Sequence, residues 1–593
     1  MKLQLPSLNK EHRGDIQALR AVAVIMVIAY HLNIIRGGFL GVDIFFVISG
    51  YVITLNLSKS QGTLKEKLVK FYLRRAKRIL PSSLTVVIFT ALAAKLFLAP
   101  IYQDRFRIDA LWSSLMGANI GFGIHKLDYL QATTAPSPFL HYWSLGVEEQ
   151  FYIIWPLIFF LFIGTRKKLF ALLLPITIAV ALISTALFPI FSFYLPTSRA
   201  FQFLFGAGLA VAGRYKSNLL MAIVGWSGIF LSAAFIPDDL ANPNRLSIIP
   251  TVCTAFVILA DSKFLTFKAL QYIGELSFTL YLVHWPIILI FGKGTQEIFG
   301  LNNFLAFLTM AIATLALTVF IELPFRYERF GKISPRGWVI ILALATLLAQ
   351  SVYLLPSKAN AVKFDLSKPI VYENNCHLDQ RHAKLNKKCT WGSAGPKLLL
   401  VGDSHAAQWF PALEKLANEK KLIVTSQTKS SCPITANSIM VAGQIDKSCD
   451  LWHQNIAKLI NTSNFDFILY SNFDKSNYQF VGDASGVSRF FNSVKTTAQV
   501  INIIDTPLPP SDSVACLSAN SSDIKKCDFD MPNAFKIHAM KSIDPMPWLC
   551  HAGICHSVLD GVNTYRDGSH ISVTTAKKYS ENLYRELLKY NRR

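Results

Sequence analysis

The sequence has few charged residues for its length. Asp, Glu, Lys and Arg make up 16% of its 593 residues, whereas a typical soluble protein has about 25%. Hydrophobic residues make up 52%, which excludes a disordered chain and argues against a wholly soluble one. The chain is also too long for one ordinary globular domain, which holds roughly 100–200 residues.

Acidic residues are the scarcer of the charges. Lys and Arg number 59 against 37 Asp and Glu, so the formal net charge is +22. A charge of this sign can indicate nucleic-acid binding, but the hydropathy points first to a membrane. In membrane proteins, the position of the positive residues reports topology.

Long apolar runs recur before residue 360 and then stop. Most have the 17–24 residues that allow a helix to cross a bilayer. There are eleven, at residues 16–35, 38–57, 79–99, 143–164, 169–190, 199–213, 218–236, 247–261, 271–292, 302–324 and 337–355. The chain after residue 360 is mixed and polar, and its roughly 230 residues are enough to bury a core of their own.

The loops between these runs differ in positive charge. With the N-terminus in the cytoplasm, the inside segments hold 22 Lys and Arg residues, and the outside loops, which include Arg36 and Arg199, hold seven. Positive residues accumulate on the cytoplasmic side. We therefore expect a cytoplasmic N-terminus, a C-terminal half outside the membrane, and no nucleic-acid partner.

Cysteine is nearly absent from the first half, where only Cys253 occurs. The other eight cysteines are Cys376, Cys389, Cys432, Cys449, Cys516, Cys527, Cys550 and Cys555. An even number suits four disulfides in an oxidising compartment, and sequential pairing is the simplest arrangement. The alternative is a zinc site, because His551 and His556 directly follow Cys550 and Cys555.

Ionisable residues lie inside several predicted spans, where charge is costly and marks candidate functional sites. Arg20 and His31 share one face of the first span, about 16 Å apart along the helix axis. Asp43, early in the second span, is either a functional residue or the counter-ion of Arg36 or Arg20.

A basic stretch precedes the third span. Residues 71–81 include Arg74, Arg75, Lys77 and Arg78. They either serve topology and contact lipid headgroups or form a phosphate site, since Arg binds phosphate through paired hydrogen bonds.

The fourth and ninth spans add further polar groups, namely His141, Glu148 and Glu149, and Tyr281 and His284. Adjacent residues of a helix point about 100° apart, so at most one of the two glutamates faces a given cavity. Recurrence of such residues on separate helices predicts a polar cavity inside the bundle.

Five separated segments, residues 18–31, 37–51, 74–81, 141–152 and 277–286, resemble in order the sequence blocks of the acyltransferase-3 family of membrane acyltransferases. The first carries the Arg-x10-His pattern, at Arg20 and His31. The resemblance covers about residues 10–335. It implies transfer of an acyl group, usually acetyl, from acyl-CoA at the inner face to a glycan outside.

The same resemblance implies roles for individual residues. His31 would be the catalytic histidine and Arg20 its motif partner. Glu149 would be an acid, a base or an orienting group, on the basis of the E-x-F-Y ending of its block. The CoA phosphates or the cytoplasmic gate would be served by three residues, Arg74, Arg75 and Arg78.

Two short motifs stand at opposite ends of the C-terminal half. Residues 397–409 predict a buried strand, a tight turn and a helix start, with Ser404 at the turn, where a nucleophile would be exposed. Near the C-terminus, Asp567 and His570 stand three residues apart. A serine nucleophile needs a base to take its proton, and the base needs an orienting partner.

These motifs resemble the GDSH and D-x-x-H blocks of the SGNH hydrolase family, over about residues 395–585. The resemblance implies Ser404 as nucleophile, His570 as base and Asp567 as the group that orients the base or positions a water. Asn472 would be an oxyanion donor, although Tyr470 stands where the family has a glycine. An acyltransferase-3 half joined to an SGNH half outside the membrane resembles bacterial glycan O-acetyltransferases.

Together these patterns predict a polytopic bundle of about eleven transmembrane helices followed by an α/β SGNH-hydrolase-like extracytoplasmic domain. The expected divisions are a transmembrane acyltransferase domain over 1–335, an eleventh span and periplasmic linker over 336–394, and the SGNH-like domain over 395–593. The expected location is the bacterial inner membrane.

The expected function is transfer of acetyl from cytoplasmic acetyl-CoA, a substrate rather than a tightly bound cofactor, to a lipid-linked or polymeric glycan, with lipopolysaccharide O-antigen as the favoured acceptor. Peptidoglycan and exopolysaccharide remain open. The alternatives are a glycan esterase with a membrane anchor and a transporter of an acylated or lipid-linked sugar.

Overall fold

A computed structural model describes residues 13–591, apart from 125–135, 164–166, 188–192, 214–216, 237–244, 292–300, 330, 356–361, 381, 442–443, 474–478, 482–484, 521 and 532–540. Part of the predicted charge asymmetry, from Lys2 and Lys10 to Lys293, lies outside the described residues. The chain divides into two compact units. A helical unit comprises residues 1–98 and 102–356, and an α/β unit comprises residues 99–101 and 357–593.

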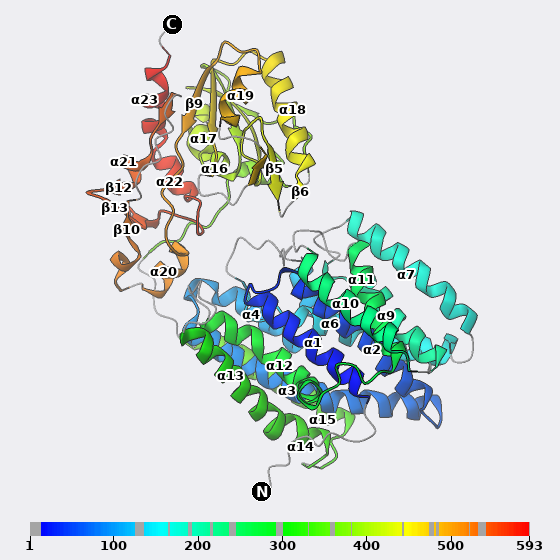
Figure 1. Cartoon of the computed structure of the whole chain (residues 1–593). Coiled ribbons are helices and arrows are strands. Elements are labelled where there is room, and N and C mark those ends of the chain that lie inside the picture. Colours follow the sequence, from blue (N-terminus) through cyan, green and yellow to red (C-terminus); the bar gives the residue numbers. More distant parts are fainter. Residues whose placement is uncertain are drawn as a thin grey trace. The chain divides into compact units, whose positions relative to one another are not determined.

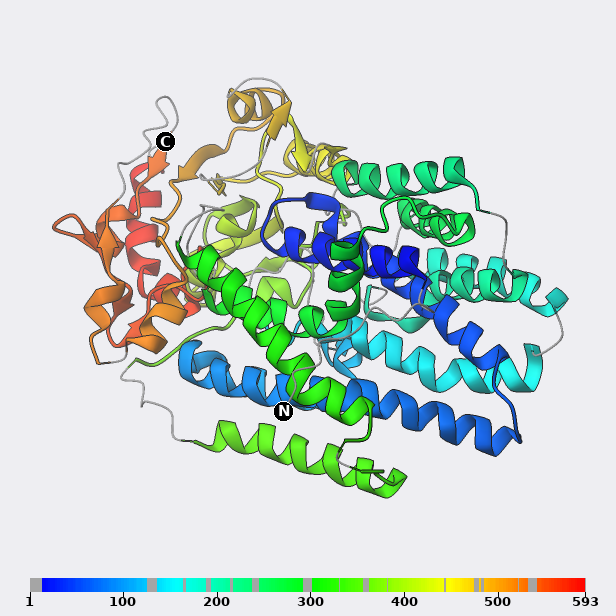
Figure 2. The ribbon, with the colours of Figure 1, turned by 60° about the horizontal axis from the view of Figure 1, so that its bottom comes forward.

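The helical unit has a helix at each of the eleven predicted runs (Figures 1 and 2). They are α1 (Gly14–His31), α2 (Gly41–Ser58), α3 (Leu64–Phe97), α6 (Tyr142–Ile158), α7 (Lys167–Leu187), α9 (Pro196–Ala212), α10 (Leu219–Phe235), α11 (Ile248–Ala260), α12 (Lys268–Phe291), α13 (Leu301–Leu317) and α15 (Pro335–Ser351). Within the described residues, seven helical segments are long and apolar enough to cross a membrane, whereas α10 and α11 are apolar but shorter. The chain is therefore a multi-pass membrane protein.

Small residues let some of these helices approach closely. A Cβ atom on Gly50 of α2 would lie 1.9 Å from the carbonyl oxygen of Phe203, and one on Gly206 of α9 would lie 1.9 Å from that of Val47. Similarly, a Cβ on Gly274 of α12 would lie 2.0 Å from the Gln17 carbonyl oxygen of α1. The last contact brings α1 and α12 close together, and both helices contribute residues to the site described below.

A buried ion pair joins the α2–α9 pair. Arg199 Nη1 lies 2.9 Å from Asp43 Oδ1, and both side chains are only 1% exposed. The alternative in which Asp43 is the counter-ion of Arg36 or Arg20 is therefore wrong, and so is the placement of Arg199 in an outside loop. Helix α9 begins at Pro196, because proline is well suited to the first turn of a helix. Arg199 therefore lies within α9, inside the bundle, where it supplies the charged partner that the buried Asp43 carboxylate needs.

The α/β unit is built on a parallel sheet with strand order β1-β4-β3-β7-β9-β11, and β2 (Thr390–Trp391) adds an antiparallel edge. Its strands are β1 (His377–Leu378), β3 (Lys397–Gly402), β4 (Ile423–Lys429), β7 (Phe467–Ser471), β9 (Gln499–Ile503) and β11 (Ser542–Ile543). Its principal helices are α16 (Ser404–Ala407), α17 (Phe410–Asn418), α18 (Lys447–Thr462), α22 (Val573–Lys578) and α23 (Ser580–Lys589). This architecture confirms the predicted fold class.

Both faces of the sheet are covered. In β3, Leu398 and Leu400 join one apolar cluster, while Leu399 and Val401 join the other. This alternation follows from the two-residue period of a strand. Figure 1 shows α18 on one side of the sheet and α22 and α23 on the other. The arrangement leaves the carboxyl ends of the parallel strands to hold the site.

The eight cysteines of the α/β unit form four disulfides between sequence neighbours, as predicted: Cys376–Cys389, Cys432–Cys449, Cys516–Cys527 and Cys550–Cys555. The zinc alternative at Cys550 and Cys555 is wrong, because their sulfurs are bonded to each other. Of the described cysteines, Cys253 in α11 is free.

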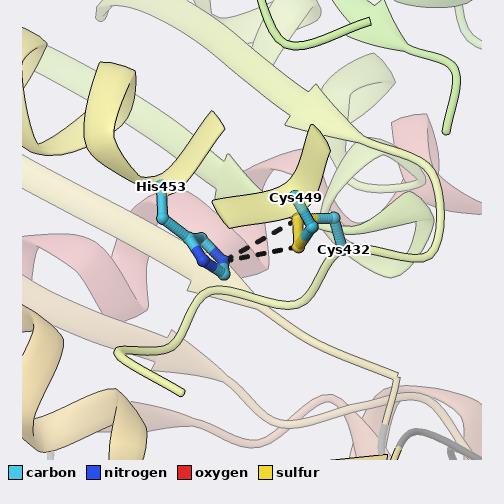
Figure 3. A group of neighbouring side chains, drawn as sticks. All are labelled: Cys432, Cys449 and His453. Atoms are coloured by element: carbon cyan, nitrogen blue, oxygen red, sulfur yellow. Dashed lines mark hydrogen bonds between the residues drawn. A yellow bond between two sulfur atoms is a disulfide. The ribbon is translucent and has the colours of Figure 1, made fainter. Parts of the chain in front are cut away.

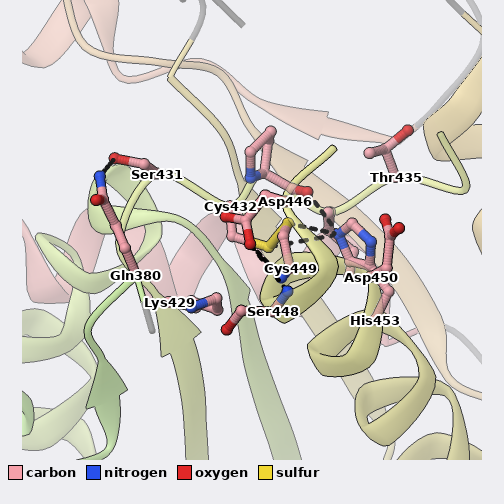
Figure 4. Close-up of a disulfide and its surroundings, with 12 residues drawn as sticks. Gln380, Lys429, Ser431, Cys432, Thr435, Asp446, Ser448, Cys449, Asp450 and His453 are labelled. Atoms are coloured by element: carbon pink, nitrogen blue, oxygen red, sulfur yellow. Dashed lines mark hydrogen bonds between the residues drawn. A yellow bond between two sulfur atoms is a disulfide. The ribbon is translucent and has the colours of Figure 1, made fainter. Parts of the chain in front are cut away.

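One disulfide has a histidine beside it. His453 Nε2 lies 3.7 Å from the Sγ atoms of both Cys432 and Cys449 (Figure 3). The three residues have the composition of a metal site, but the two sulfurs are joined in a disulfide (Figure 4). In addition, His453 Nε2 donates to the Pro433 carbonyl oxygen at 2.9 Å. The group is therefore a structural anchor for the loop after β4.

Candidate active sites

The turn after β3 exposes Ser404 at the start of α16. Gly402 has φ +130°, and a Cβ there would lie 2.1 Å from the Ser471 carbonyl oxygen, so the turn requires glycine. The next residue, Asp403, is buried; its Oδ1 accepts from the His405 N–H and its Oδ2 from the Phe473 N–H, both at 2.8 Å. Asp403 thus fixes the serine turn to the end of β7.

Asp567 and His570 form a hydrogen-bonded pair. His570 Nδ1 lies 3.0 Å from both carboxylate oxygens of Asp567, and Asp567 Oδ1 also accepts from the backbone N–H groups of Ser569 and His570. Since Nδ1–H donates to the carboxylate, the neutral ring keeps a lone pair on Nε2. Among the described residues, this buried Nε2 has no hydrogen-bond partner.

Electrostatics suit His570 to act as a base. Burial lowers the pKa of His570 to about 4, against the opposing effect of Asp567. Burial by itself would raise the pKa of Asp567, but the hydrogen bond and charge of His570, together with the charge of Arg566, hold it well below its usual range. At neutral pH the pair is a carboxylate and an uncharged imidazole, which is the form a general base requires.

The structure brings the two motifs together, although they are far apart in sequence. The imidazole rings of His405 and His570 lie 4.6 Å apart, at an angle of 39°. Gln408, just after α16, accepts the Ile571 N–H through Oε1 at 2.9 Å. These contacts hold the Asp567–His570 loop beside the Ser404 turn.

A second histidine–aspartate pair was not predicted. His405 Nδ1 lies 2.6 Å from Asp505 Oδ1, and both residues are buried. Burial alone would lower the pKa of His405, but the Asp505 carboxylate raises it above its usual value. The available signal was the position of Asp505, two residues after the end of β9 and therefore at the same edge of the sheet as Ser404.

Asn472 lies at the end of β7, as predicted, but its amide is largely engaged. Its Oδ1 accepts from the Ile434 N–H at 2.8 Å, and its Nδ2 donates to the Ile434 carbonyl oxygen at 3.2 Å. Within the part of the chain that the structure describes, this leaves one N–H of the amide for a reacting oxygen. Ile434 stands two residues after Cys432, so the disulfide anchors the backbone that holds Asn472.

The helical unit contains a polar cavity of about 390 Å³. Its volume is in the range of small-molecule sites, about 300–1,000 Å³. Its charged lining residues come from α1, α2, α3, α6, α12 and α14 (Leu323–Arg326) and from the residues that flank α1 and α2: Arg13, Arg20, Lys59, Arg75, Arg78, Glu148, Glu275 and Arg326. Three predicted site residues, Arg20, Arg75 and Arg78, thus share the cavity, whereas Arg74 is not among its lining residues.

Of the two adjacent glutamates, Glu148 lines the cavity and Glu149 does not. The carboxylate of Glu148 accepts hydrogen bonds from the Ser49 hydroxyl and the Tyr152 hydroxyl. The side chain of Glu149 is directed elsewhere, and its buried Oε1 has no partner among the described residues. The geometry therefore favours Glu148 over Glu149 as the glutamate that can contact a substrate in the cavity.

His31, at the end of α1, is not among the residues that line this cavity; it lies in a cluster with His141, directly before α6, and His284 of α12. Its Nδ1 lies 3.0 Å from His284 Nε2, and the two rings stack at 5.1 Å. The His141 ring lies 5.6 Å from that of His284. Tyr281 connects the two regions: it lines the cavity, its hydroxyl bonds to Ser144 at 2.6 Å, and its carbonyl oxygen bonds to His284 Nδ1.

Comparison with known proteins gives matches over both units. Residues 13–323 match the family described as "Acyltransferase domain", and residues 375–585 match that described as "SGNH domain (fused to AT3 domains)". A solved structure of the periplasmic domain of a Salmonella ser. Paratyphi A lipopolysaccharide acetyltransferase matches 38% of this chain and 91% of its own, with 15% identity and a TM-score of 0.28.

Curated relatives include a peptidoglycan O-acetyltransferase, OatA, of Listeria monocytogenes, 34% identical over 54% of this chain and 57% of its own length. A putative peptidoglycan O-acetyltransferase of Bacillus subtilis, YrhL, is 32% identical over 56% of this chain and 58% of its own length. The chain thus spans a little over half the length of these relatives. Since the acyltransferase match alone covers about half of the chain, the protein belongs to the acyltransferase-3 family, in the group whose membrane domain is fused to an SGNH domain.

Proposed function

We propose that this protein transfers an acetyl group from acetyl-CoA to a hydroxyl group of a cell-envelope glycan. The proposal is carried by one observation: a single chain holds a cavity lined with arginines in its helical unit and an Asp567–His570 pair beside Ser404 in its α/β unit. The names of the relatives, which are O-acetyltransferases, support the same reaction class.

The first stage takes place in the helical unit. Acetyl-CoA enters from the cytoplasm, and its phosphates bind Arg75 and Arg78, which line the cavity together with Arg20. Arginine suits this role because its guanidinium forms paired hydrogen bonds to phosphate oxygens. His31 then takes the proton of the hydroxyl group that attacks the thioester carbon; the C–S bond breaks, and the proton passes to the CoA thiolate, which leaves as the thiol. Glu148, in place of the predicted Glu149, orients the reacting groups.

The second stage takes place in the α/β unit. Ser404 Oγ attacks the acyl carbonyl carbon and gives its proton to His570 Nε2, which passes it to the leaving group. A sugar hydroxyl then attacks the serine ester, and its proton moves through His570 back to Ser404 Oγ. Asp567 holds the imidazole in the reactive tautomer, and the free N–H of Asn472 donates to the oxyanion.

The acceptor is a glycan outside the cytoplasmic membrane. Four disulfides suit an oxidising compartment, which supports a periplasmic α/β unit and, on that ground, lipopolysaccharide O-antigen. The relatives are named for peptidoglycan, so peptidoglycan is the second candidate acceptor.

The test is the O-acetyl content of lipopolysaccharide and peptidoglycan, each purified separately and measured by NMR. The strains compared carry the wild-type gene, His31→Ala, Ser404→Ala or no gene, with equal amounts of protein in the membrane. Loss of acetyl esters from one glycan in all three altered strains supports the proposal and identifies the acceptor. A gain of acetyl esters in Ser404→Ala would make the α/β unit an esterase, and unchanged glycans would favour a transporter.

A further inference from the structure

One arginine that lines the cavity of the helical unit lies outside the five segments that resemble the acyltransferase-3 family. It is Arg326, at the end of α14. We propose that Arg326 is a further phosphate-binding residue of this cavity, held in place by Glu275 and Glu322. This inference rests on the proposed function, in which acetyl-CoA occupies the cavity and its phosphates bind arginines.

Two carboxylates hold Arg326 through a single nitrogen atom. Its Nη1 lies 3.3 Å from Glu275 Oε1 and 3.5 Å from Glu322 Oε1. Glu275 belongs to α12, and Glu322 ends the π-helix η5 (Thr318–Glu322). In the part of the chain that the structure describes, Nε and Nη2 of Arg326 have no such contact. A guanidinium carries five N–H donors in a planar fork, so one edge remains that can form paired hydrogen bonds to a phosphate.

Glu275 is itself fixed by a neighbouring helix. Its Oε2 accepts a hydrogen bond from Gln17 Nε2 of α1 at 3.1 Å, while its Oε1 contacts Arg326. The preceding residue, Gly274, packs against the Gln17 carbonyl oxygen and so fixes the spacing of α12 from α1. Both oxygens of this carboxylate are therefore engaged with the protein, which explains how an acidic residue can line a cavity for an anionic ligand.

The exposure of this cluster distinguishes it from a purely structural ion pair. The Arg199–Asp43 contact is 2.9 Å long, and both side chains are 1% exposed. The Arg326 and Glu275 side chains are 27% and 20% exposed, and their contact is 3.3 Å long. Since the usual N–H···O length is about 2.7–3.2 Å, Arg326 can shift toward a ligand without the loss of a strong bond.

The cavity holds more positive than negative charge, because its lining includes six basic residues and two glutamates. One of the six, Arg13, is paired with Asp15 and Asp261. By contrast, Arg20 and Arg78 have neither a hydrogen bond nor an ion pair with any residue that the structure describes. Unneutralised charge inside a membrane protein is costly, so the cavity suits an anion with several charges. Acetyl-CoA supplies a diphosphate and a 3′-phosphate, which has a charge of about −1.5 to −2 at pH 7.

The test measures the Kd of acetyl-CoA for the full chain in detergent by titration calorimetry. Arg326→Gln should weaken binding by about tenfold or more, because it removes a charge-assisted phosphate contact. Arg326→Lys keeps the charge without the paired geometry and should fall between the wild type and Arg326→Gln. The matched control is Arg329→Gln, at an exposed arginine that is not among the lining residues, and it should change the Kd less than about twofold. An unchanged Kd in Arg326→Gln would overturn the inference.

A double variant separates phosphate binding from neutralisation of the glutamates. If Arg326 were only the counter-ion of Glu275, adding Glu275→Gln to Arg326→Gln would restore wild-type binding and overturn the inference. We expect instead that the double variant binds acetyl-CoA about tenfold or more weakly than Glu275→Gln alone. Because this variant has one uncompensated carboxylate fewer, it provides the test even if Arg326→Gln alone does not fold.

Ligands that lack phosphates show which group Arg326 binds. If it binds the 3′-phosphate, Arg326→Gln should weaken acetyl-CoA binding and leave the Kd of acetyl-dephospho-CoA unchanged. If it binds the diphosphate, the substitution should weaken both ligands equally, and either result supports the inference. An equal loss for S-acetylpantetheine, which has no phosphate, would overturn it.

Acetyl transfer in proteoliposomes distinguishes failure of this inference from failure of the proposed function. If the wild type transfers acetyl from acetyl-CoA and Arg326→Gln binds acetyl-CoA as tightly as the wild type, the role of Arg326 is wrong and the proposed function stands. If Arg326→Gln weakens acetyl-CoA binding as expected but the wild type transfers no acetyl, the proposed function fails and the phosphate site stands.

Discussion

The imidazole rings of His405 and His570 lie 4.6 Å apart, and each is held through Nδ1 by its own aspartate, Asp505 and Asp567. The two histidines nevertheless have opposite electrostatic settings. The carboxylate of Asp505 raises the pKa of His405 against the effect of burial, while burial and the nearby His405 charge lower that of His570 to about 4. One member of the pair therefore tends to carry charge, which keeps its neighbour in the neutral form.

The pH dependence of the α/β site should reflect this pairing. His570 acts as a base only when unprotonated, so kcat/KM for hydrolysis of a small aryl acetate should rise through about pH 4 and be flat at pH 6. An ordinary histidine would still be half protonated near pH 6.5. Asp505→Asn removes the charge that favours protonated His405, and it should move the acid limb upward by about one pH unit. An unchanged limb would show that the two imidazoles are not coupled.

Asp567 should be essential to the reactivity of Ser404. Asp567→Asn cannot hold the Nδ1 proton of His570 as a carboxylate does, so the ring loses the reactive tautomer, and kcat should fall by about 10³–10⁴-fold. Acetate release from the aryl ester by the full chain measures this. Asp560→Asn, at an exposed aspartate of the same unit that pairs with Lys578, is the matched control and should stay within about twofold of wild type.

Three arginines of α3 should contribute unequally to acetyl-CoA binding. Arg75 and Arg78 line the cavity, and Arg74 does not. Arg75→Gln and Arg78→Gln should each weaken acetyl-CoA binding by about tenfold or more, because each removes a charge-assisted phosphate contact, and Arg74→Gln should change it less than about threefold. Titration calorimetry in detergent measures the Kd values. Equal effects of all three would indicate a general attraction of the basic stretch for anions.

The two glutamates can be separated in the same way. Glu148→Gln should lower kcat for acetyl transfer by about 100-fold, because its carboxylate faces the cavity with Ser49 and Tyr152. Glu149→Gln should cost less than about fivefold if Glu148 is the reacting group. The measurement is acetyl transfer in proteoliposomes at saturating acetyl-CoA. The opposite order would restore the role that the sequence blocks imply for Glu149.

The disulfides should contribute unequally to stability. Cys432 and Cys449 are 17 residues apart, and Cys550 and Cys555 are five apart. Loop-closure entropy then predicts losses of about 3 and about 2 kcal/mol when each pair is changed to serine. Thermal unfolding of the α/β unit within the full chain compares the two. Replacement of Cys432 and Cys449 should also lower kcat, because this disulfide anchors the backbone that holds Asn472. Replacement of Cys550 and Cys555 should leave kcat nearly unchanged.

The sequence predicted local features well. Each apolar run became a helix, residues 397–409 became a strand, turn and helix start, and the cysteines paired with their neighbours. All of these features depend on hydropathy or on contacts between residues close in sequence, and both can be read from one amino-acid sequence.

Partners across the fold were harder to predict. Nothing in the spacing of Asp43 and Arg199, or of His31 and His284, reveals that these residues meet, because the contact depends on which helices pack together. Helix periodicity likewise predicts that only one of Glu148 and Glu149 faces a given cavity, but it does not indicate which one. Asp505 was missed because a lone aspartate after a strand is common in loops, and only the order of the parallel strands brings it to His405.

The glycine contacts between α2 and α9 bear on how such a bundle can move. With Gly50 against the Phe203 backbone and Gly206 against that of Val47, any sliding of one helix along the other drives a larger side chain into the opposite main chain. The buried Asp43–Arg199 pair opposes the same displacement. The α2–α9 interface therefore resists relative movement of the two helices, so under the proposed function any opening that admits an acyl group has to come from movement of other helices.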